Sequence, residues 1–143
     1  MYQVSRNIIK DEMRAEEAMQ DAFLAAFDKL EEFKGEVTFG AWLKKIVVNK
    51  SLDYLKKDKM YEKAASADDL ELIEETEEID ITEKVDSIKA AMNQLPEKYR
   101  IILSLYYLEG YDYEEISEIL DLSYSNSRVL INRAKNKLVS LLN

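Results

Sequence analysis

The chain has 143 residues, of which 20 are Lys or Arg and 29 are Asp or Glu, so its formal net charge is −9. It contains no Cys and no His, which excludes a disulfide framework, a zinc site of the usual ligand set and a Ser-His-Asp triad. No apolar run approaches the ~20 residues that a bilayer requires and the first residues lack a signal-peptide core, so we expect a cytoplasmic protein.

The composition favours an all-α fold. Three Gly and one Pro are fewer than the turns of a β-protein need, and the abundant Ala, Leu, Glu and Lys are good helix formers. The acidic excess is local, because residues 61–95 hold 11 acidic and 3 basic residues. We therefore predict two small helical domains, residues 1–60 and 83–143, joined by an acidic linker, residues 61–82. The alternative for the linker is a solvated helix that continues the first domain.

Residues 15–30 have apolar side chains at every third or fourth position, which predicts an amphipathic helix. Leu24 lies on the opposite face, next to Gln20 and several acidic residues. Such a Leu is either an isolated exposed apolar residue or the centre of a contact with a basic partner. The stripe expected to face the core is Ala15, Ala18, Met19, Ala22, Phe23, Ala26, Phe27 and Leu30.

The next helix is expected to be basic and to follow an aromatic loop. Thr38 is positioned to cap it, and residues 44–59 hold six Lys and two Asp. Lys beside Phe33, Phe39 and Trp42 suits single-stranded nucleic acid, where phosphates meet Lys and bases stack on rings. The simpler alternative is a core aromatic pair with a solvated Lys face. Core positions on this helix would be Trp42, Ile46, Val47, Leu52 and Leu55.

The C-terminal part has the pattern of a helix-turn-helix. Helices are expected over residues 82–94 and from Pro96, which suits a first helical turn, to Gly110, which suits a stop. Asp112 with Glu115 forms a capping box for the next helix, and Ser123 caps the last one.

The last helix is basic, since no acidic residue follows Asp121, whereas Arg128, Arg133, Lys135 and Lys137 do. Such a helix indicates DNA recognition, with side chains near its N-terminus at base edges and cations at phosphates. The alternative is an ordinary helical hairpin with cations at a favourable helix end.

Five short motifs follow one another along the chain. They are AEEAMQDAF at residues 15–23, WLKKIVVNKSLD at 42–53, the acidic segment, Leu95-Pro96 with Tyr99-Arg100, and Arg133-Ala134 with Leu138. In order and spacing they resemble the extracytoplasmic-function (ECF) sigma factors of bacteria over nearly the whole chain. The resemblance implies a region 2-like helical bundle and a region 4-like helix-turn-helix.

The resemblance also implies partners and site residues. The partners would be core RNA polymerase, promoter DNA and an anti-sigma factor, with no small-molecule substrate, catalytic residue, metal or cofactor. Polymerase would contact Glu17, Gln20, Asp21, Leu24 and Asp28. A −10-type element would be read and melted by Phe33, Phe39, Trp42, Lys45, Asn49, Lys56 and Lys57. A −35-type element would meet Tyr124, Ser125, Asn126, Arg128 and Asn132, with Arg133 and Lys135 on phosphates.

Two departures from the family pattern bear on these expectations. The family has a further helix upstream, so we expect either that this chain is truncated or that its first domain is incomplete. Ser127 stands where the family usually has Val, and a buried hydroxyl needs a partner or costs ~1–3 kcal/mol, so we expect Ser127→Val to stabilise the fold. The runner-up function is a helix-turn-helix regulator that does not engage polymerase, followed by a helical adaptor that does not bind DNA. An enzyme is the class least indicated.

Overall fold

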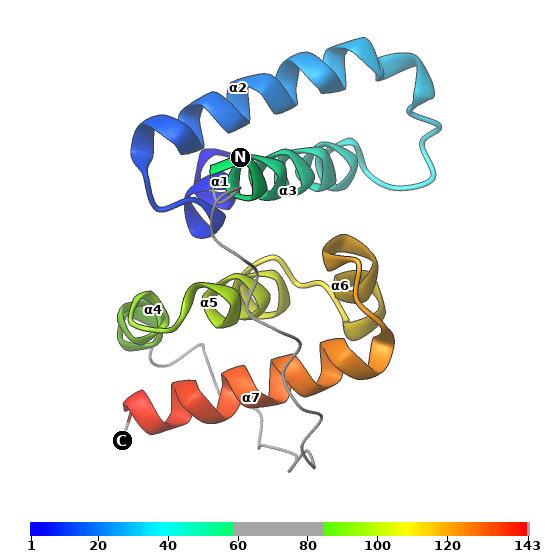
Figure 1. Cartoon of the computed structure of the whole chain (residues 1–143). Coiled ribbons are helices and arrows are strands. Elements are labelled where there is room, and N and C mark those ends of the chain that lie inside the picture. The colour runs from blue at the N-terminus through cyan, green and yellow to red at the C-terminus, as the bar shows by residue number, and fades with distance from the viewer. Residues whose placement is uncertain (59–84, 143) are drawn as a thin grey trace. The chain divides into compact units, whose positions relative to one another are not determined.

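The computed structural model describes residues 1–58 and 85–142, which form helices and contain no strand. The chain divides into two compact units, Met1–Ser66 and Ala67–Asn143, and each is described by itself (Figure 1). The all-α prediction is confirmed over these residues, whereas the predicted linker, residues 61–82, lies outside them. None of the described helices is both long and apolar enough to cross a membrane.

Over residues 1–58, the first unit forms three α-helices and one 3-10 turn. Helix α2 begins where the Asp11 carboxylate accepts a hydrogen bond of 3.1 Å from the Arg14 backbone N–H. Helix α3 begins where the Thr38 hydroxyl accepts a hydrogen bond of 3.1 Å from the Ala41 N–H, as predicted. The bounds are α1 Tyr2–Ile8, α2 Glu12–Asp28, η1 Leu30–Glu32 and α3 Phe39–Asp58.

Small side chains bring these helices together. Ala15, Ala18 and Ala22 of α2 are completely buried, as are Val47 and Val48 of α3. Helices α1, α2 and α3 all contact one another. Where they meet, the Ser5 hydroxyl lies 2.9 Å from the Ala15 carbonyl oxygen and 2.9 Å from the Ser51 hydroxyl. An alanine edge lets the two long helices run close together (Figure 1), so the core is thin and tightly packed.

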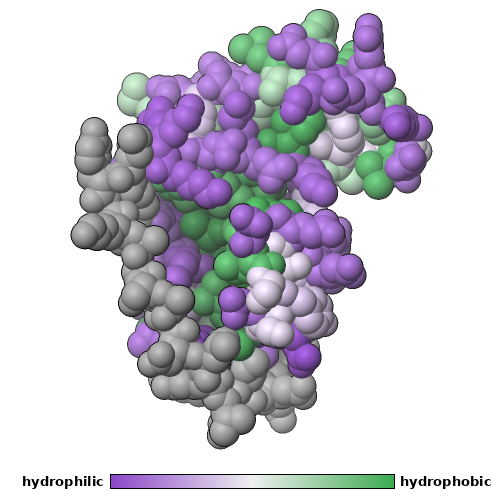
Figure 2. All heavy atoms as spheres, turned by 45° about the vertical axis from the view of Figure 1, so that its right-hand side comes forward, coloured by the Kyte–Doolittle hydropathy of each residue, from purple (hydrophilic) through white to green (hydrophobic). Residues whose placement is uncertain are grey.

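The large apolar residues of the predicted α2 stripe do not lie in this core. Phe23, Phe27 and Leu30 are 42%, 78% and 47% exposed, which corrects the sequence expectation. The buried edge of α2 is made of alanines, and the large side chains beside it stay exposed. With Phe39 and Leu43 they line an apolar groove, and Figure 2 shows hydrophobic residues at the surface of this unit among hydrophilic ones.

The part of the second unit that the structure describes, residues 85–142, forms four α-helices and one π-helical turn. Pro96 is the N-cap of α5, and Gly110, with φ +76°, follows the end of the π-turn, as the sequence indicated. The capping box of Asp112 and Glu115 is present, and the Ser123 hydroxyl accepts the Asn126 N–H at 3.1 Å. The bounds are α4 Val85–Asn93, α5 Glu97–Leu103, η2 Ser104–Leu108, α6 Tyr113–Leu120 and α7 Tyr124–Leu142.

Helix α7 supplies much of the core of this unit and contacts α4, α5 and α6. Ser127, Ile131, Ala134 and Leu138, which share one face of α7, are completely buried. Leu141, near the end of α7, is 36% exposed. Helices α6 and α7 follow each other as a helix-turn-helix (Figure 1), so the exposed first turn of α7 projects from a packed body.

Candidate functional site

The outer face of α2 carries the predicted polymerase contacts. Glu17, Gln20, Leu24 and Asp28 follow one another at helical spacing and are exposed, and Leu24 is 67% exposed. Met13, which the sequence analysis did not single out, is 74% exposed and lies on the same face three turns earlier. This face of α2 therefore exposes two apolar side chains, Met13 and Leu24, among acidic residues and a Gln.

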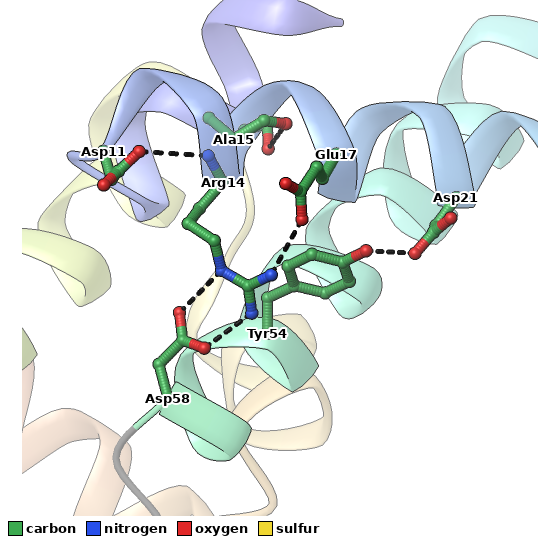
Figure 3. Close-up of polar contacts among 8 residues, drawn as sticks. Asp11, Arg14, Ala15, Glu17, Asp21, Tyr54 and Asp58 are labelled. Carbon is green, nitrogen blue, oxygen red and sulfur yellow. Dashed lines mark hydrogen bonds and ion pairs between the residues drawn. The ribbon is translucent and has the colours of Figure 1, made fainter.

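Two carboxylates of this face take part in a polar network between α2 and α3 (Figure 3). The Asp21 carboxylate accepts a hydrogen bond from the Tyr54 hydroxyl. Arg14 donates to Glu17 at 2.8 Å and to the Asp58 carboxylate through two bonds of 3.1 and 2.5 Å. Its guanidinium also lies 4.4 Å from the centre of the Tyr54 ring. Asp21 and Arg14 therefore join α2 to α3, whereas Glu17 contacts Arg14 within α2.

The network shifts two proton equilibria. The hydrogen bond to Asp21, with burial adding to it, raises the pKa of Tyr54 from 10.0 to about 12. The hydrogen bonds to Asp58 raise the pKa of Arg14, so its guanidinium stays charged. Both groups hold their protons at neutral pH, and the network is therefore intact there.

The predicted aromatic loop is assembled as a cluster at the start of α3. The ring centres of Phe33 and Trp42 are 5.3 Å apart, and Phe39 lies 5.6 Å from Phe33 and 5.7 Å from Trp42. Phe39 is 48% exposed. The rings form neither the closed core pair of the simpler interpretation nor isolated surface residues, since they pack together with one ring open to solvent.

The basic residues predicted beside this cluster lie along α3. At 100° per residue, Lys45, Asn49 and Lys56 fall on the face of α3 that begins with Trp42, and all three are exposed. Asp53 lies on the same face and Lys57 beside it, both exposed. An aromatic cluster followed by a mostly basic helical face is a surface that can accept both bases and phosphates.

The first turn of α7 presents the predicted base-reading residues. Tyr124, Ser125 and Asn126 are exposed, and Arg128 and Arg133 are half-buried. The Arg128 guanidinium lies 6.0 Å from the Tyr113 ring centre and 5.9 Å from that of Tyr124. Tyr124, Ser125 and Asn126 are thus open to solvent at the start of the second helix of the helix-turn-helix.

Two predicted DNA contacts are not on this surface. Asn132 is 5% exposed and Lys135 is 2% exposed, contrary to the expectation that both face DNA. Val129, one turn before Asn132, is buried too, so this edge of α7 is covered. The Lys135 ammonium lies 4.6 Å from the Tyr106 ring centre, where its apolar stem and its charge are both accommodated.

Sequence reasoning missed Arg14, Tyr54 and Asp58 of the α2–α3 network. The only local signal was the spacing of Arg14 and Glu17 at i and i+3. Tyr54 and Asp58 follow Arg14 by 40 and 44 residues, and no pattern within one helix connects positions so far apart.

Comparison with known families covers both units. A family described as Sigma-70 region 2 matches residues 1–61, and one described as Sigma-70, region 4 matches residues 86–138. The ECF RNA polymerase sigma factor SigM of Bacillus subtilis is 27% identical over 150 residues, covering 100% of this chain and 88% of the relative. The ECF RNA polymerase sigma-E factor of Haemophilus influenzae is 31% identical over 144 residues, covering 92% of this chain and 73% of the relative.

Two solved structures share the fold. The sigma factor RpoE of Bartonella quintana, solved in complex with the anti-sigma factor NepR, has a TM-score of 0.66 at 21% identity, covering 99% of this chain and 88% of that one. CnrH, solved in complex with the cytosolic domain of CnrY, has a TM-score of 0.58 at 24% identity, covering 99% and 79%.

Proposed function

The chain belongs to the ECF RNA polymerase sigma factors, and we propose that its two helical units divide promoter recognition between them. It is an initiation factor that binds core RNA polymerase and directs it to promoter DNA. We infer that this role needs no catalytic step by the chain and is carried out in the cytoplasm, where polymerase and promoter lie. The regulator that never engages polymerase is not favoured, because the family match includes the first unit as well as the helix-turn-helix.

The outer face of α2 is the proposed polymerase contact. The observation that carries this assignment is the 67% exposure of Leu24, an apolar side chain that no described neighbour covers. Around it lie Glu17, Gln20, Asp21 and Asp28, which suit a partner surface that is apolar at its centre and basic at its rim. Met13 extends the same face.

The aromatic cluster and the basic face of α3 are the proposed −10-type site. Phe39 offers an exposed ring beside Phe33 and Trp42, on which an unpaired base can stack. The residues that would follow the phosphates of the strand are Lys45, Asn49, Lys56 and Lys57. Since the whole chain has a net charge of −9, core polymerase would supply most of the non-specific grip on DNA.

The first turn of α7 is the proposed −35-type reader. Tyr124, Ser125 and Asn126 are exposed there and can reach base edges in a major groove. Arg133, predicted to hold a phosphate, is half-buried and keeps that role. Arg128, predicted to read a base, is half-buried too, and we assign it to a phosphate at the groove wall. Asn132 and Lys135, being buried, are left out of this surface.

An anti-sigma factor is the proposed regulatory partner. The similar RpoE of Bartonella quintana was solved with an anti-sigma factor bound, and the exposed apolar residues of the first unit are surfaces that such a partner can cover.

Co-elution of the purified chain with bacterial core RNA polymerase tests the polymerase contact. Wild type should co-elute, and Leu24→Arg should abolish co-elution while keeping the helical circular dichroism spectrum. Val37→Arg is the matched control, because Val37 is 54% exposed but lies in the loop before α3. A folded wild-type chain that does not co-elute, or a control that fails equally, contradicts the assignment.

Selection of DNA from a randomised library by the reconstituted holoenzyme tests promoter reading. Two separated blocks of preferred sequence are expected. Asn126→Ala should relax only the upstream block, because Asn126 lies in the −35-type reader. A variant that relaxes neither block contradicts the proposed role of α7.

A further inference from the structure

Lys135 is a buried cation that the proposed recognition surface does not use. It is 2% exposed, and its ammonium lies 4.6 Å from the ring centre of Tyr106, 5.8 Å from that of Tyr107 and 6.0 Å from that of Tyr113. A Lys on the last helix of a DNA-binding domain is ordinarily expected at the surface. Here three tyrosine rings lie close to the charge.

The rings continue toward the start of α7. Tyr106 and Tyr113 are stacked, with centres 5.4 Å apart and planes 14° apart. Tyr113 and Tyr124 meet edge to face at 6.3 Å. Arg128 lies over both of these last rings, at 6.0 and 5.9 Å. We call Tyr106, Tyr113, Tyr124, Arg128 and Lys135 the cation–tyrosine cluster.

The cluster joins three elements of the helix-turn-helix. Tyr106 comes from the π-turn η2, Tyr113 is the first residue of α6, and the other three residues belong to α7. Arg128 and Lys135 are seven residues apart, about two turns, so they contact the rings from one side of α7. Since Tyr124 also lies in the exposed first turn, the cluster runs from a buried anchor to the proposed base-reading residues.

We propose that Lys135 is a positioning residue, which anchors α7 on the tyrosines of η2 and α6 so that its first turn is held in the orientation that reads DNA. Lys135 makes no DNA contact in this role. Tyr106 contacts Lys135 and stacks on Tyr113, so the pair links Lys135 to the start of α6. Tyr113 and Tyr124 together restrict the Arg128 guanidinium. The inference rests on the proposed role of α7 as the −35-type reader.

Salt dependence separates positioning from a phosphate contact. A Lys that neutralises a phosphate contributes about 0.9 to the slope of log affinity against log salt concentration, and a buried positioning Lys contributes nothing. The assay uses the holoenzyme and the duplex selected from the randomised library, with a second duplex in which the upstream block is scrambled. The two readouts are the salt slope and the affinity ratio between the two duplexes.

For Lys135→Met, which keeps a flexible apolar stem, the slope should stay unchanged and the affinity ratio should fall at least about fivefold, the size of one lost base contact. Lys135→Arg should retain the ratio, because a guanidinium can also lie over the rings. Tyr106→Leu leaves the net charge unchanged and should lower the ratio in the same way, which keeps the inference testable if Lys135→Met does not fold.

A slope reduced by about 0.9 in Lys135→Met makes Lys135 a phosphate contact and overturns the inference. If Lys135→Met and Tyr106→Leu both fold and leave the ratio and the slope unchanged, the cluster contributes only ordinary packing. That result also overturns the inference.

Two further variants test the premise on its own. Arg133→Gln should lower the slope and Asn126→Ala should lower the ratio. If both leave the readouts unchanged, the −35-type role of α7 fails and the inference fails with it. If they respond and the Lys135 variants do not, only the inference fails.

Discussion

The Arg14 guanidinium and the Asp58 carboxylate join the first turns of α2 to the end of α3 through two hydrogen bonds of 3.1 and 2.5 Å (Figure 3). Asp58 is the last residue of α3. The pair therefore ties the N-terminal end of the proposed polymerase-binding helix to the C-terminal end of the proposed DNA-binding helix.

Asp58→Ala should destabilise the first unit by up to ~1 kcal/mol. The estimate is small because the Arg14 and Asp58 side chains are 34% and 40% exposed, and solvent screens such a pair. Trp42 is the one Trp of the chain and lies in this unit, so urea unfolding followed by Trp fluorescence reports the effect. Asp53→Ala, on the same helix and exposed, is the matched control, and an equal loss there contradicts the prediction.

The effect of Asp58→Ala should also shrink at high salt. Exposed charges are screened over a distance that shortens to about 3 Å at 1 M salt. Repeating the unfolding series at that concentration should bring the variant closer to wild type, and a loss that does not depend on salt would show that Asp58 acts by something other than its charge.

Tyr54→Phe should remove a stabilisation that depends on pH. The pKa of Tyr54 is raised from 10.0 to about 12, so the protonated phenol favours the folded state. The contribution is fully present below pH 10 and is lost as pH rises through about 12. Because Asp21 is the acceptor and hydrogen bonds to charged groups are the stronger ones, we expect about 1.5–3 kcal/mol at neutral pH.

The measurement is the difference in unfolding free energy between wild type and Tyr54→Phe across this pH range. The variant keeps the ring under Arg14, so the comparison isolates the hydroxyl. A difference that is constant up to pH 12 would mean that the hydrogen bond to Asp21 does not couple to folding.

The contrast between Thr38 and Phe27 explains what the sequence could predict. Thr38 caps α3, as do Asp112 and Ser123 for their helices, because a cap depends on residues two or three positions away. Phe27 belongs to the same predicted apolar stripe as Ala26. Ala26 is buried, but Phe27 is 78% exposed. Periodicity gives the side of a helix, whereas the position of the neighbouring helix decides whether that side is covered.

Lys135 illustrates the same limit for the candidate site. Its charge and position near the C-terminus predicted a surface contact, but tyrosines more than 20 residues earlier in the chain surround it. The exposed first turn of α7 was predictable because it precedes the first buried residue, Ser127. Contacts between distant helices were not predictable, and they decide which basic residues can reach DNA.

Ser127→Val should raise the stability of the second unit by up to ~1 kcal/mol. Ser127 is completely buried, and its hydroxyl donates to the Ser123 carbonyl oxygen at 3.0 Å. That oxygen also accepts the Ser127 backbone N–H, so losing the hydroxyl leaves no acceptor unpaired. The added methyl groups then gain burial, a smaller gain than relief of an unpartnered hydroxyl would give.

Thermal unfolding followed by circular dichroism tests this prediction, with Ser127→Ala separating loss of the hydroxyl from gain of volume. Trp42 fluorescence should report no change, because Trp42 belongs to the other unit. A lower melting temperature for Ser127→Val than for Ser127→Ala would show that the core around this position has no room for the larger side chain.

Phe39→Ala should impair promoter melting more than it impairs folding. The ring is 48% exposed, so its removal costs the first unit little. A base stacked on an aromatic ring contributes about 1–3 kcal/mol, which predicts a roughly 5- to 150-fold loss in the equilibrium for strand opening. Permanganate reactivity of unpaired thymines in the holoenzyme–promoter complex measures that loss, and co-elution with core polymerase should be retained.

Val37→Ala is the control for Phe39→Ala, because Val37 is 54% exposed in the same loop but is not part of the aromatic cluster. If the two variants open promoter DNA equally well, the Phe39 ring does not bind an unpaired base. Reduced melting by Phe39→Ala alone, with unchanged binding to duplex containing the upstream block, would assign the two steps of promoter recognition to different units. Duplex binding should be unchanged because Phe39 lies in the first unit and the proposed −35-type reader in the second.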